Sequence, residues 1–274
     1  MQKWLKKLII TIFLLGLFIP TTLIQAQTVV KVAVIGDSTN GIWDLVQQNL
    51  DQAGEDIKIE LVSFTDGVYA NAAQYDGELD LTAFQHNAFL AQENEEKGYG
   101  LVAIGDTFIS PMNIFSEQID SLDQIKAGDS VSIPNNVTNQ GRALYVLDRA
   151  GLIKLDEEVG FTPDIHDIKE NPLNLEIKEV APENILPTLP DVTIGITNSD
   201  FALDYGLDPV EDAVFHLDFD PNDEAFKPYV NIITARKEDK DNPTYQAIVK
   251  AYQQDNVYDY ILDTFNNAMV PVWK

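Results

Sequence analysis

The run Val29-Val30-Lys31-Val32-Ala33-Val34-Ile35, which ends at Gly36, is rich in β-branched residues and predicts a strand. Apolar residues then recur at helical spacing between Ile42 and Leu50. Residues 57–62 alternate between apolar and polar side chains, as a second strand does. A strand, a helix and a strand in this order favour two parallel strands joined by a right-handed crossover. The stretch therefore predicts an α/β fold.

The same alternation continues along the chain and then restarts. We expect further strands over residues 79–84 and 101–108, and a second β/α unit that begins near residue 121. A strand over residues 229–234 and one long, mostly amphipathic helix over residues 243–265 complete the prediction.

Breaks in this pattern near residues 109–113 and 218–227 indicate that the chain crosses twice between two lobes. We expect lobe I to comprise residues 27–110 and 226–274, and lobe II to comprise residues 111–225. Open α/β sheets bind ligands at the carboxyl ends of their parallel strands. The prediction is therefore a central ligand cleft between two lobes.

The first 26 residues have the layout of a secretory signal peptide. Three lysines within the first seven residues precede the apolar run Leu8–Ile19, which is too short to span a bilayer, and Ala26 is a small residue suited to cleavage. We expect residues 1–26 to be removed and the protein to be exported, to the periplasm or to the extracellular face of the cell membrane. An uncleaved signal anchor is the alternative.

Composition excludes several classes of function. The formal net charge is −26, and loss of the three N-terminal lysines would make it still more negative. Such a surface repels nucleic acid and anionic lipid. The chain contains no Cys, so we expect neither disulfides nor thiolate catalysis, and no lipid anchor attached through a Cys.

The sequence lacks the motifs of common catalytic and cofactor sites. Gly36–Gly41 resembles a phosphate loop but is followed by Ile42-Trp43, not by Lys and Ser or Thr. The acidic stretch Asp218–Glu224 departs from the calcium-loop pattern, and the three histidines have no zinc spacing. We therefore expect no cofactor, no metal and no enzymatic activity. The helix start after Gly36 remains a candidate cleft wall that presents backbone N–H groups.

Polar and aromatic residues gather where predicted strands end. Phe84, His86 and Phe89 follow one strand, and Asp200 follows another. The segment 134–142 surrounds a helix start with polar side chains, including Asn139, and places Arg142 in what would be the first helical turn. A cation there is disfavoured by the helix dipole, and an anion held by the guanidinium would offset that cost. A surface Arg paired with a carboxylate is the alternative.

Asn231 lies inside the apolar strand that we predict over residues 229–234. A buried Asn needs partners, either a structural hydrogen bond or a ligand.

The sequence contains, in this order, Glu78–His86, Lys97–Tyr99, Pro134–Asn135, Thr138–Asn139, Gly141–Leu144, Ala150–Ile153, Glu170–Leu175, Ala202–Leu203, Gly206–Pro209 and Tyr229–Asn231. Together these stretches resemble the methionine-binding lipoprotein family of bacterial ABC importers, the NlpA type. The resemblance implies a two-lobed periplasmic binding protein of class II that closes over one amino acid. It implies that Arg142 holds the substrate carboxylate and that Asn231 contacts the amino-acid backbone. Phe84 and His86 would then line the side-chain pocket.

Three positions depart from that family's pattern. The family usually has a lipid-modified Cys after the signal, and this chain has none. Gly67 stands where an aromatic residue is typical, and Tyr69 is a candidate to replace it. Asp200 stands where Asn is typical, and its carboxylate would suit a substrate ammonium group. These departures leave the identity of the ligand open.

The resulting hypothesis is an extracytoplasmic solute-binding protein that works with an ABC permease and ATPase. Its ligand would be L-methionine, with another amino acid or a methionyl dipeptide as the alternative. A secreted enzyme or an adhesin with the same fold is less well supported. The expected ligand-binding residues are Tyr69, Phe84, His86, Phe89, Asn139, Arg142, Asp200 and Asn231.

Overall fold

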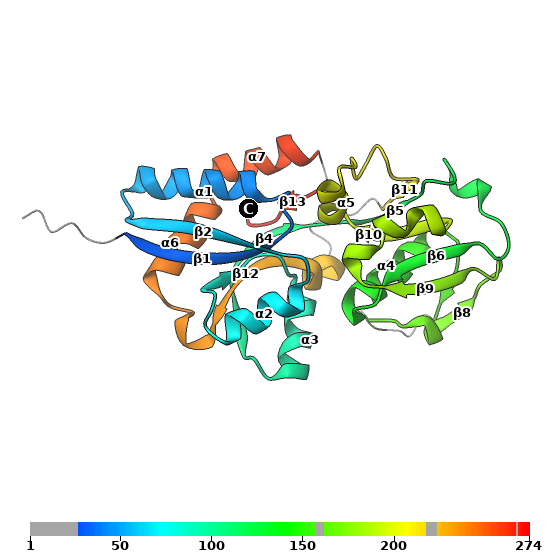
Figure 1. Cartoon of the computed structure of the whole chain (residues 1–274), viewed down its shortest axis with the longest axis horizontal. Helices are drawn as coiled ribbons and strands as arrows, with labels where there is room; N and C mark the ends of the chain where they lie inside the picture. The colour runs from blue at the N-terminus through cyan, green and yellow to red at the C-terminus, as the bar shows by residue number, and fades with distance from the viewer. Residues whose placement is uncertain (1–26, 157–159, 161, 218–223, 267) are drawn as a thin grey trace, which may run out of the picture.

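The computed structural model describes residues 27–156, 160, 162–217, 224–266 and 268–274. The predicted signal peptide and residues 218–223 of the predicted acidic loop lie outside the described residues. The described chain forms two α/β lobes that lie side by side (Figure 1), each built around its own sheet. The predicted α/β architecture is therefore confirmed.

Lobe I contains a six-stranded sheet with the order β13-β4-β12-β3-β1-β2. Its strands are β1 (Thr28–Ile35), β2 (Ile57–Phe64), β3 (Leu81–Thr82), β4 (Leu101–Ile109), β12 (Val230–Arg236) and β13 (Val270–Pro271). β1 is parallel to β2 and β3, whereas β12 is antiparallel to β3 and β4, and β13 is antiparallel to β4. The sheet is thus mixed, because only its first half follows the predicted strand–helix–strand pattern.

Lobe II contains a five-stranded sheet with the order β11-β5-β10-β6-β9. Its strands are β5 (Met112–Phe115), β6 (Ser130–Pro134), β9 (Glu176–Val180), β10 (Ile194–Asn198) and β11 (Phe215–His216), and β7 (Lys154–Leu155) pairs separately with β8 (Ile168–Glu170). The chain leaves the first sheet at Ile109 and enters the second at Met112. It returns between His216 and Val230. The lobe boundaries drawn from the sequence, 27–110 with 226–274 and 111–225, remain predictions at the level of single residues.

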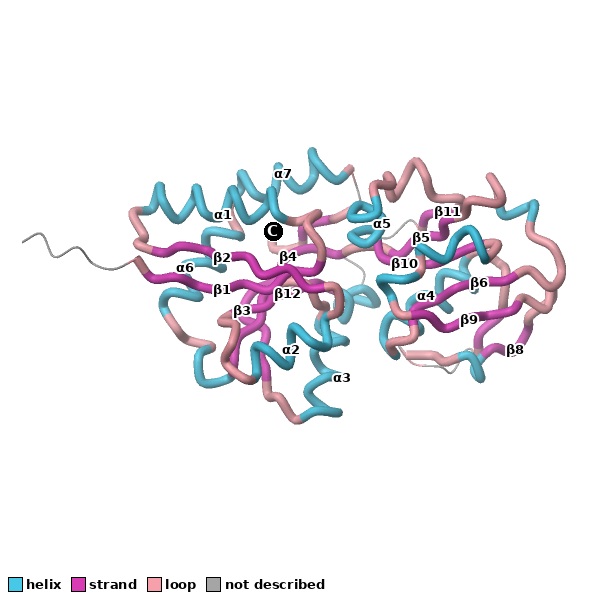
Figure 2. The backbone as a smooth tube through the Cα atoms, viewed as in Figure 1, coloured by secondary structure: helices cyan, strands magenta, loops and turns pink. Residues whose placement is uncertain are grey.

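Helices cover both faces of the lobe I sheet (Figures 1 and 2). The alternation along β1 directs Val30, Val32 and Val34 into a core shared with α1 (Asn40–Ala53), α6 (Pro243–Tyr252) and α7 (Asp255–Phe265). Ala33 points to the opposite face and packs near α2 (Gly67–Tyr75), and α3 (Asn87–Lys97) contacts β4 and β12. In lobe II, α4 (Val137–Arg149) and α5 (Ser199–Tyr205) pack on the second sheet. Among the described residues, no helix is long and apolar enough to cross a bilayer.

Two predicted elements are corrected by the structure. The strand expected over residues 79–84 is confined to β3, because the buried Gln85 amide forms hydrogen bonds with Asn71 and Thr82 and regular strand pairing stops there. Beyond β3 the chain keeps only isolated pairing with β12, at Gln85 and His86. The single helix expected over residues 243–265 is broken at Gln253 and Gln254 into α6 and α7. The break lets both helices pack against α1.

Candidate functional site

A small cavity of about 60 Å³ lies between the two lobes. Lobe I contributes residues that follow its parallel strands, and lobe II contributes the starts of α4 and α5. The cavity is lined by Ile35, Thr65, Asp66, Gly67, Phe84, Gln85, His86, Phe89, Asn136, Asn139, Pro182, Glu183, Asp200 and Phe201. The predicted residues Phe84, His86, Phe89, Asn139 and Asp200 are therefore brought together at one interlobe site. We call it the cleft.

His86 is held as a neutral imidazole with one defined tautomer. Its Nδ1 accepts the backbone N–H of Phe89 at 3.1 Å, which caps the start of α3. The hydrogen therefore resides on Nε2, which lies 3.2 Å from Asn139 Oδ1 and donates to it. Burial, followed by the positive charge of Arg142, lowers the pKa of His86 to about 3. The ring also stands edge-on to Phe89 and Tyr229.

Arg142 is a buried cation whose described hydrogen-bond partners are neutral. Its Nη1 donates to Asn139 Oδ1 at 3.3 Å and its Nη2 donates to the Ser110 carbonyl at 2.6 Å, while the guanidinium lies 4.9 Å from the Tyr229 ring centroid. No carboxylate among the described residues lies within ion-pair distance of it. Burial lowers the pKa of Arg142 to about 10, and the side chain remains charged at neutral pH.

The position of Arg142 in its helix differs from the prediction. Because α4 begins at Val137 and is capped by the Asn136 side chain, Arg142 lies in the second turn, not the first. The helix dipole therefore opposes its charge less than the sequence suggested. The cost that an anion would offset is the burial of the guanidinium without a negatively charged described partner.

Asp200 and Arg142 both form hydrogen bonds with Ser110. The Ser110 hydroxyl donates to Asp200 Oδ1 at 3.0 Å and accepts the Asp200 backbone N–H at 3.4 Å, while the Ser110 carbonyl accepts from Arg142. Burial raises the pKa of the Asp200 carboxyl, and the nearby Asp204 raises it further. The carboxylate is half-buried, lines the cleft and forms no ion pair among the described residues, so it can bind an ammonium group.

Asn231 reaches the site from β12. Its backbone forms an isolated antiparallel bridge with His86, and the residue is buried. No hydrogen bond joins its side-chain amide to another residue in the part of the chain that the structure describes. Asn231 does not line the 60 Å³ cavity itself, but its pairing with His86 places it at the cleft wall.

The aromatic residues of the site differ in their placement. Phe84 and Phe89 pack edge-to-face with ring centroids 6.2 Å apart. The Phe84 ring lies directly against Gly67, where an added Cβ would overlap it. Tyr69, the predicted substitute for the missing aromatic at position 67, is instead 68% exposed on α2 and lines none of the cavities described. The structure therefore does not bring Tyr69 to the cleft.

A buried network of amide and hydroxyl groups supports the loop that carries Phe84 and His86. Gln85 and Asn71 exchange two hydrogen bonds, and Gln85 also donates to Thr82. The hydroxyl oxygens of Thr82 and Thr234 are 2.6 Å apart, and the Thr234 hydroxyl donates to Gln74 Oε1. Fully paired polar groups in a protein interior fix one arrangement of the chain. The network therefore holds the loop rigidly against β12.

A second contact between the lobes lies beside the cleft. The carboxylate of Asp204 on α5 accepts the backbone N–H groups of Asp37 at 3.0 Å and Ser38 at 2.7 Å. Gly36 has a φ of 62°, and an added Cβ there would overlap the Asp204 carboxylate. The N–H groups predicted to face a ligand at this loop therefore bind a carboxylate of the other lobe.

Three residues of the site were not predicted from the sequence. Ser110 lies in a crossing segment, and Glu183 and Phe201 reach the cleft from lobe II. Asn136 also reaches the cleft, and it lies within the polar segment 134–142 as the cap of α4. Among the described residues no group of His, Asp and Glu side chains is placed to hold a metal ion.

Two lobes that meet over a small polar pocket, joined by crossing segments, define a solute-binding protein of the periplasmic type. Comparison with known proteins gives the family. Residues 30–273 match the family described as NlpA lipoprotein, and the chain belongs to that family, as its sequence resemblance predicted.

Relatives and solved structures agree with this assignment. The chain is 37% identical over 251 residues to the D-methionine-binding lipoprotein MetQ of Yersinia pestis, covering 91% of this chain and 90% of the relative. It is 38% identical to the protein of that name from Escherichia coli K12, covering 89% and 88%. A nutrient-binding protein from Burkholderia cenocepacia bound to methionine superposes with a TM-score of 0.81 at 32% identity, covering 89% of this chain and all of that one. The predicted fold class is therefore confirmed.

Proposed function

We propose that this protein is the extracytoplasmic solute-binding component of an ABC importer, and that it captures an amino acid, with L-methionine favoured, without catalysing a reaction. The observation that carries the proposal is the set of groups that meet between the lobes. They are a half-buried acid (Asp200) and two packed aromatic rings (Phe84 and Phe89) that line the cleft, and a buried cation (Arg142) that lines an adjoining cavity and is hydrogen-bonded to the cleft residue Asn139. The methionine-binding relatives support the same ligand.

The chemistry of the cleft matches the two charged ends of an amino acid. Arg142 would bind the carboxylate, together with the donor Nε2 of His86, and Asp200 would bind the ammonium group. The amide of Asn231 would complete the contacts to the backbone of the ligand. Charge-assisted hydrogen bonds in a site closed to water are stronger than their counterparts in solvent.

The side chain of the ligand would pack between the two phenylalanines. A cavity of about 60 Å³ holds roughly five water-sized groups, which is less than methionine needs. Binding of methionine therefore requires the lobes to separate slightly or the Phe84 ring to rotate. Such a movement is expected of a protein that opens and closes around its ligand, and differential affinity for the closed state drives the closure.

A methionyl dipeptide is the second candidate, and one observation favours it. A cavity of about 230 Å³ adjoins the cleft and shares Ile35, Thr65, Pro182, Glu183 and Phe201 with it. A ligand longer than one amino acid could extend into this space. We propose further that the protein is exported and delivers its ligand to a permease and ATPase, as the family resemblance implies.

Calorimetric titration of the refolded, ligand-free protein with L-methionine, D-methionine, the other amino acids and methionyl dipeptides tests the proposal. We expect a single ligand class to bind in the micromolar range or tighter, which is a binding free energy of about 8 kcal/mol or more. Arg142→Gln should reduce the affinity by at least about a hundredfold, because it leaves the carboxylate without its charged partner. Unchanged affinity in a folded Arg142→Gln protein would rule out the carboxylate assignment.

A further inference from the structure

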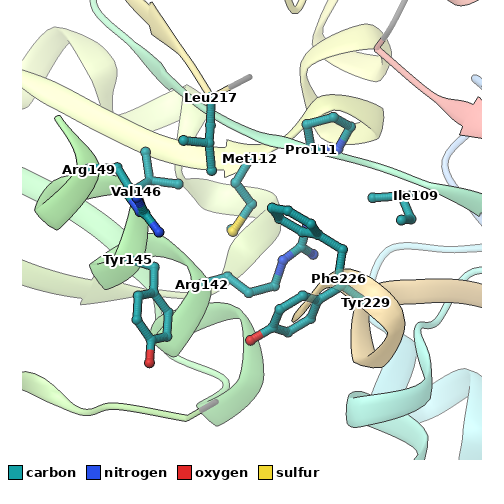
Figure 3. A pocket seen from close by; sticks show the side chains of 10 residues that line it. All are labelled: Ile109, Pro111, Met112, Arg142, Tyr145, Val146, Arg149, Leu217, Phe226 and Tyr229. Atoms are coloured by element: carbon teal, nitrogen blue, oxygen red, sulfur yellow. The ribbon is translucent and has the colours of Figure 1, made fainter. Parts of the chain in front are cut away.

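The crossing segment between β4 and β5 contains a buried serine that contacts both charged groups of the site. Ser110 is 1% exposed, its carbonyl accepts Arg142 Nη2 at 2.6 Å, and its hydroxyl contacts Asp200. Arg142 reaches from α4 toward this segment, where it lines a cavity of about 240 Å³ with Ile109 and Pro111, the neighbours of Ser110 (Figure 3). One residue between the lobes therefore touches both the cation and the acid that an amino acid would meet.

The hydroxyl of Ser110 forms two hydrogen bonds with Asp200, one in each direction. It donates to Asp200 Oδ1 at 3.0 Å and accepts the Asp200 backbone N–H at 3.4 Å. The side chain of Asn198, which precedes α5, does not cap this helix, so the Ser110 hydroxyl takes the place of a cap. Because Ser110 binds both the backbone and the carboxylate of Asp200, it fixes the orientation of this side chain. In the part of the chain that the structure describes, no hydrogen bond or ion pair engages Asp200 Oδ2.

The electrostatic surroundings of Asp200 give this contact its importance. Burial raises the pKa of the Asp200 carboxyl, and the hydrogen bond from Ser110 is the strongest influence that lowers it. The charge of Asp204 on the same helix raises this pKa further, and that of Arg142 lowers it. The other titratable groups that line the cleft are two acids and one neutral imidazole, Asp66, Glu183 and His86. An ionised Asp200 in this mostly acidic cleft therefore depends on the Ser110 hydroxyl.

We propose that Ser110 is a positioning residue for ligand binding: its hydroxyl keeps the Asp200 carboxylate ionised and turned so that Oδ2 is free to accept the ammonium group of the ligand. The assignment rests on the proposed function, since it places an amino acid in the cleft. A hydrogen bond to a charged acceptor is stronger than one to a neutral acceptor, so the hydroxyl favours the ionised form. Ser110 does not line the cleft itself, and it acts through Asp200.

The first test measures the Asp200 carboxyl in the ligand-free protein, by carbon-13 NMR of chains labelled at the Asp carboxyl carbon. The signal that disappears in Asp200→Asn gives the assignment. Ser110→Ala removes the hydroxyl but retains the backbone carbonyl that binds Arg142, and we expect it to raise the Asp200 pKa by about one pH unit. Ser132→Ala removes another buried hydroxyl of lobe II, on β6, and should leave this pKa unchanged. Equal Asp200 pKa values in wild type and Ser110→Ala would refute the role of Ser110.

The second test is calorimetry across pH with the amino acid that the wild type binds. Ser110→Ala should bind roughly tenfold more weakly at neutral pH, and its affinity should begin to fall about one pH unit higher than that of the wild type. In an Asp200→Asn background the same substitution should have almost no effect, because the carboxylate through which Ser110 acts is gone.

The outcomes separate this role from the proposed function. Equal affinity of wild type and Ser110→Ala, or an equal loss in the Asp200→Asn background, would overturn the positioning role while the proposed function stands. Failure of the wild type to bind any amino acid would instead refute the proposed function, and the ammonium contact with it. The NMR measurement needs no ligand, so it tests the bond between Ser110 and Asp200 in either case.

Discussion

At the scale of single residues, Asn139 forms hydrogen bonds with both the Arg142 guanidinium and the His86 imidazole. Its Oδ1 accepts from both His86 Nε2 and Arg142 Nη1. A carboxylate oxygen of a bound amino acid would offer the same two donors a stronger acceptor. In the proposed complex, Asn139 would act as a neutral substitute that keeps both donors oriented until the ligand arrives, and its own amide would then turn toward the ligand.

The neutral state of His86 leads to a prediction about pH. Its pKa is lowered from 6.5 to about 3, so the unfolded chain binds a proton between these values that the folded protein does not. Stability from this residue is therefore fully present above pH 6.5 and is lost as the pH falls toward 3. We expect the stability difference between wild type and His86→Gln to shrink steadily over this range in chemical denaturation experiments. NMR titration of the His86 ring should show no protonation above pH 5; a midpoint near 6.5 would contradict the assignment.

Asp200 gives a second prediction at this scale. Burial raises the pKa of its carboxyl, and a bound ammonium group would lower that pKa again, so binding should release a proton at a pH near the raised pKa. We expect the affinity for the amino acid to fall as the pH is lowered through the raised pKa. Asp200→Asn should bind roughly tenfold more weakly at neutral pH and lose this pH dependence. Calorimetry in buffers of different ionisation enthalpy measures the proton release, and its absence in wild type would argue against an ammonium at Asp200.

At the scale of elements, a glycine at the start of α2 lets the loop after β3 pack closely against this helix. Gly67 is the first residue of α2, and the Phe84 ring occupies the place of its missing side chain. The ring can therefore pack against the backbone and still reach Phe89. The aromatic side chain that packs against position 67 is thus Phe84 from another element, and not the neighbouring, exposed Tyr69.

This packing predicts a specific coupling between positions 67 and 84. Gly67→Ala should move the Phe84 ring, because the new Cβ would overlap it, and should change ligand affinity while the helix capped by Asp66 is retained. In a Phe84→Ala background the same substitution should have almost no effect, since the obstructing ring is gone. Affinity and thermal stability of the four proteins in this double-mutant cycle measure the coupling. Additive effects would show that the two positions do not interact.

The sequence predicted elements best where local pattern and tertiary packing agree. β1, α1 and β2 lie where the period of the apolar residues placed them. β3 was overestimated because Gln85 is held by Asn71, which is distant in sequence, and no local pattern records such a partner. Arg142 was predicted as a site residue but placed one helical turn too early. Several polar residues precede the helix, and the sequence does not show which of them caps it; in the structure it is Asn136. Asp204 was not predicted, because its partners lie in the other lobe.

At the scale of the whole molecule, few direct polar contacts between the described residues join the two lobes, apart from the crossing segments. His86 of lobe I meets Asn139 of lobe II, and Asp204 of lobe II meets the loop after β1. The second contact needs no ligand, and it is made by backbone N–H groups that cannot rotate away. It therefore favours the closed arrangement in the absence of ligand, and ligand binding should benefit from this preference.

Removal of the Asp204 carboxylate should shift the molecule toward an open arrangement. We expect Asp204→Ala to increase the radius of gyration of the ligand-free protein in small-angle X-ray scattering. Affinity for the amino acid should fall by roughly tenfold, because closure then costs more. Gly36→Ala should have the same effect, since its Cβ would displace the carboxylate. Asp191→Ala makes the same charge change at an exposed position of lobe II and should alter neither quantity. An unchanged scattering profile with weakened binding would instead mean that Asp204 touches the ligand directly, which the longer, dipeptide-sized ligand would explain.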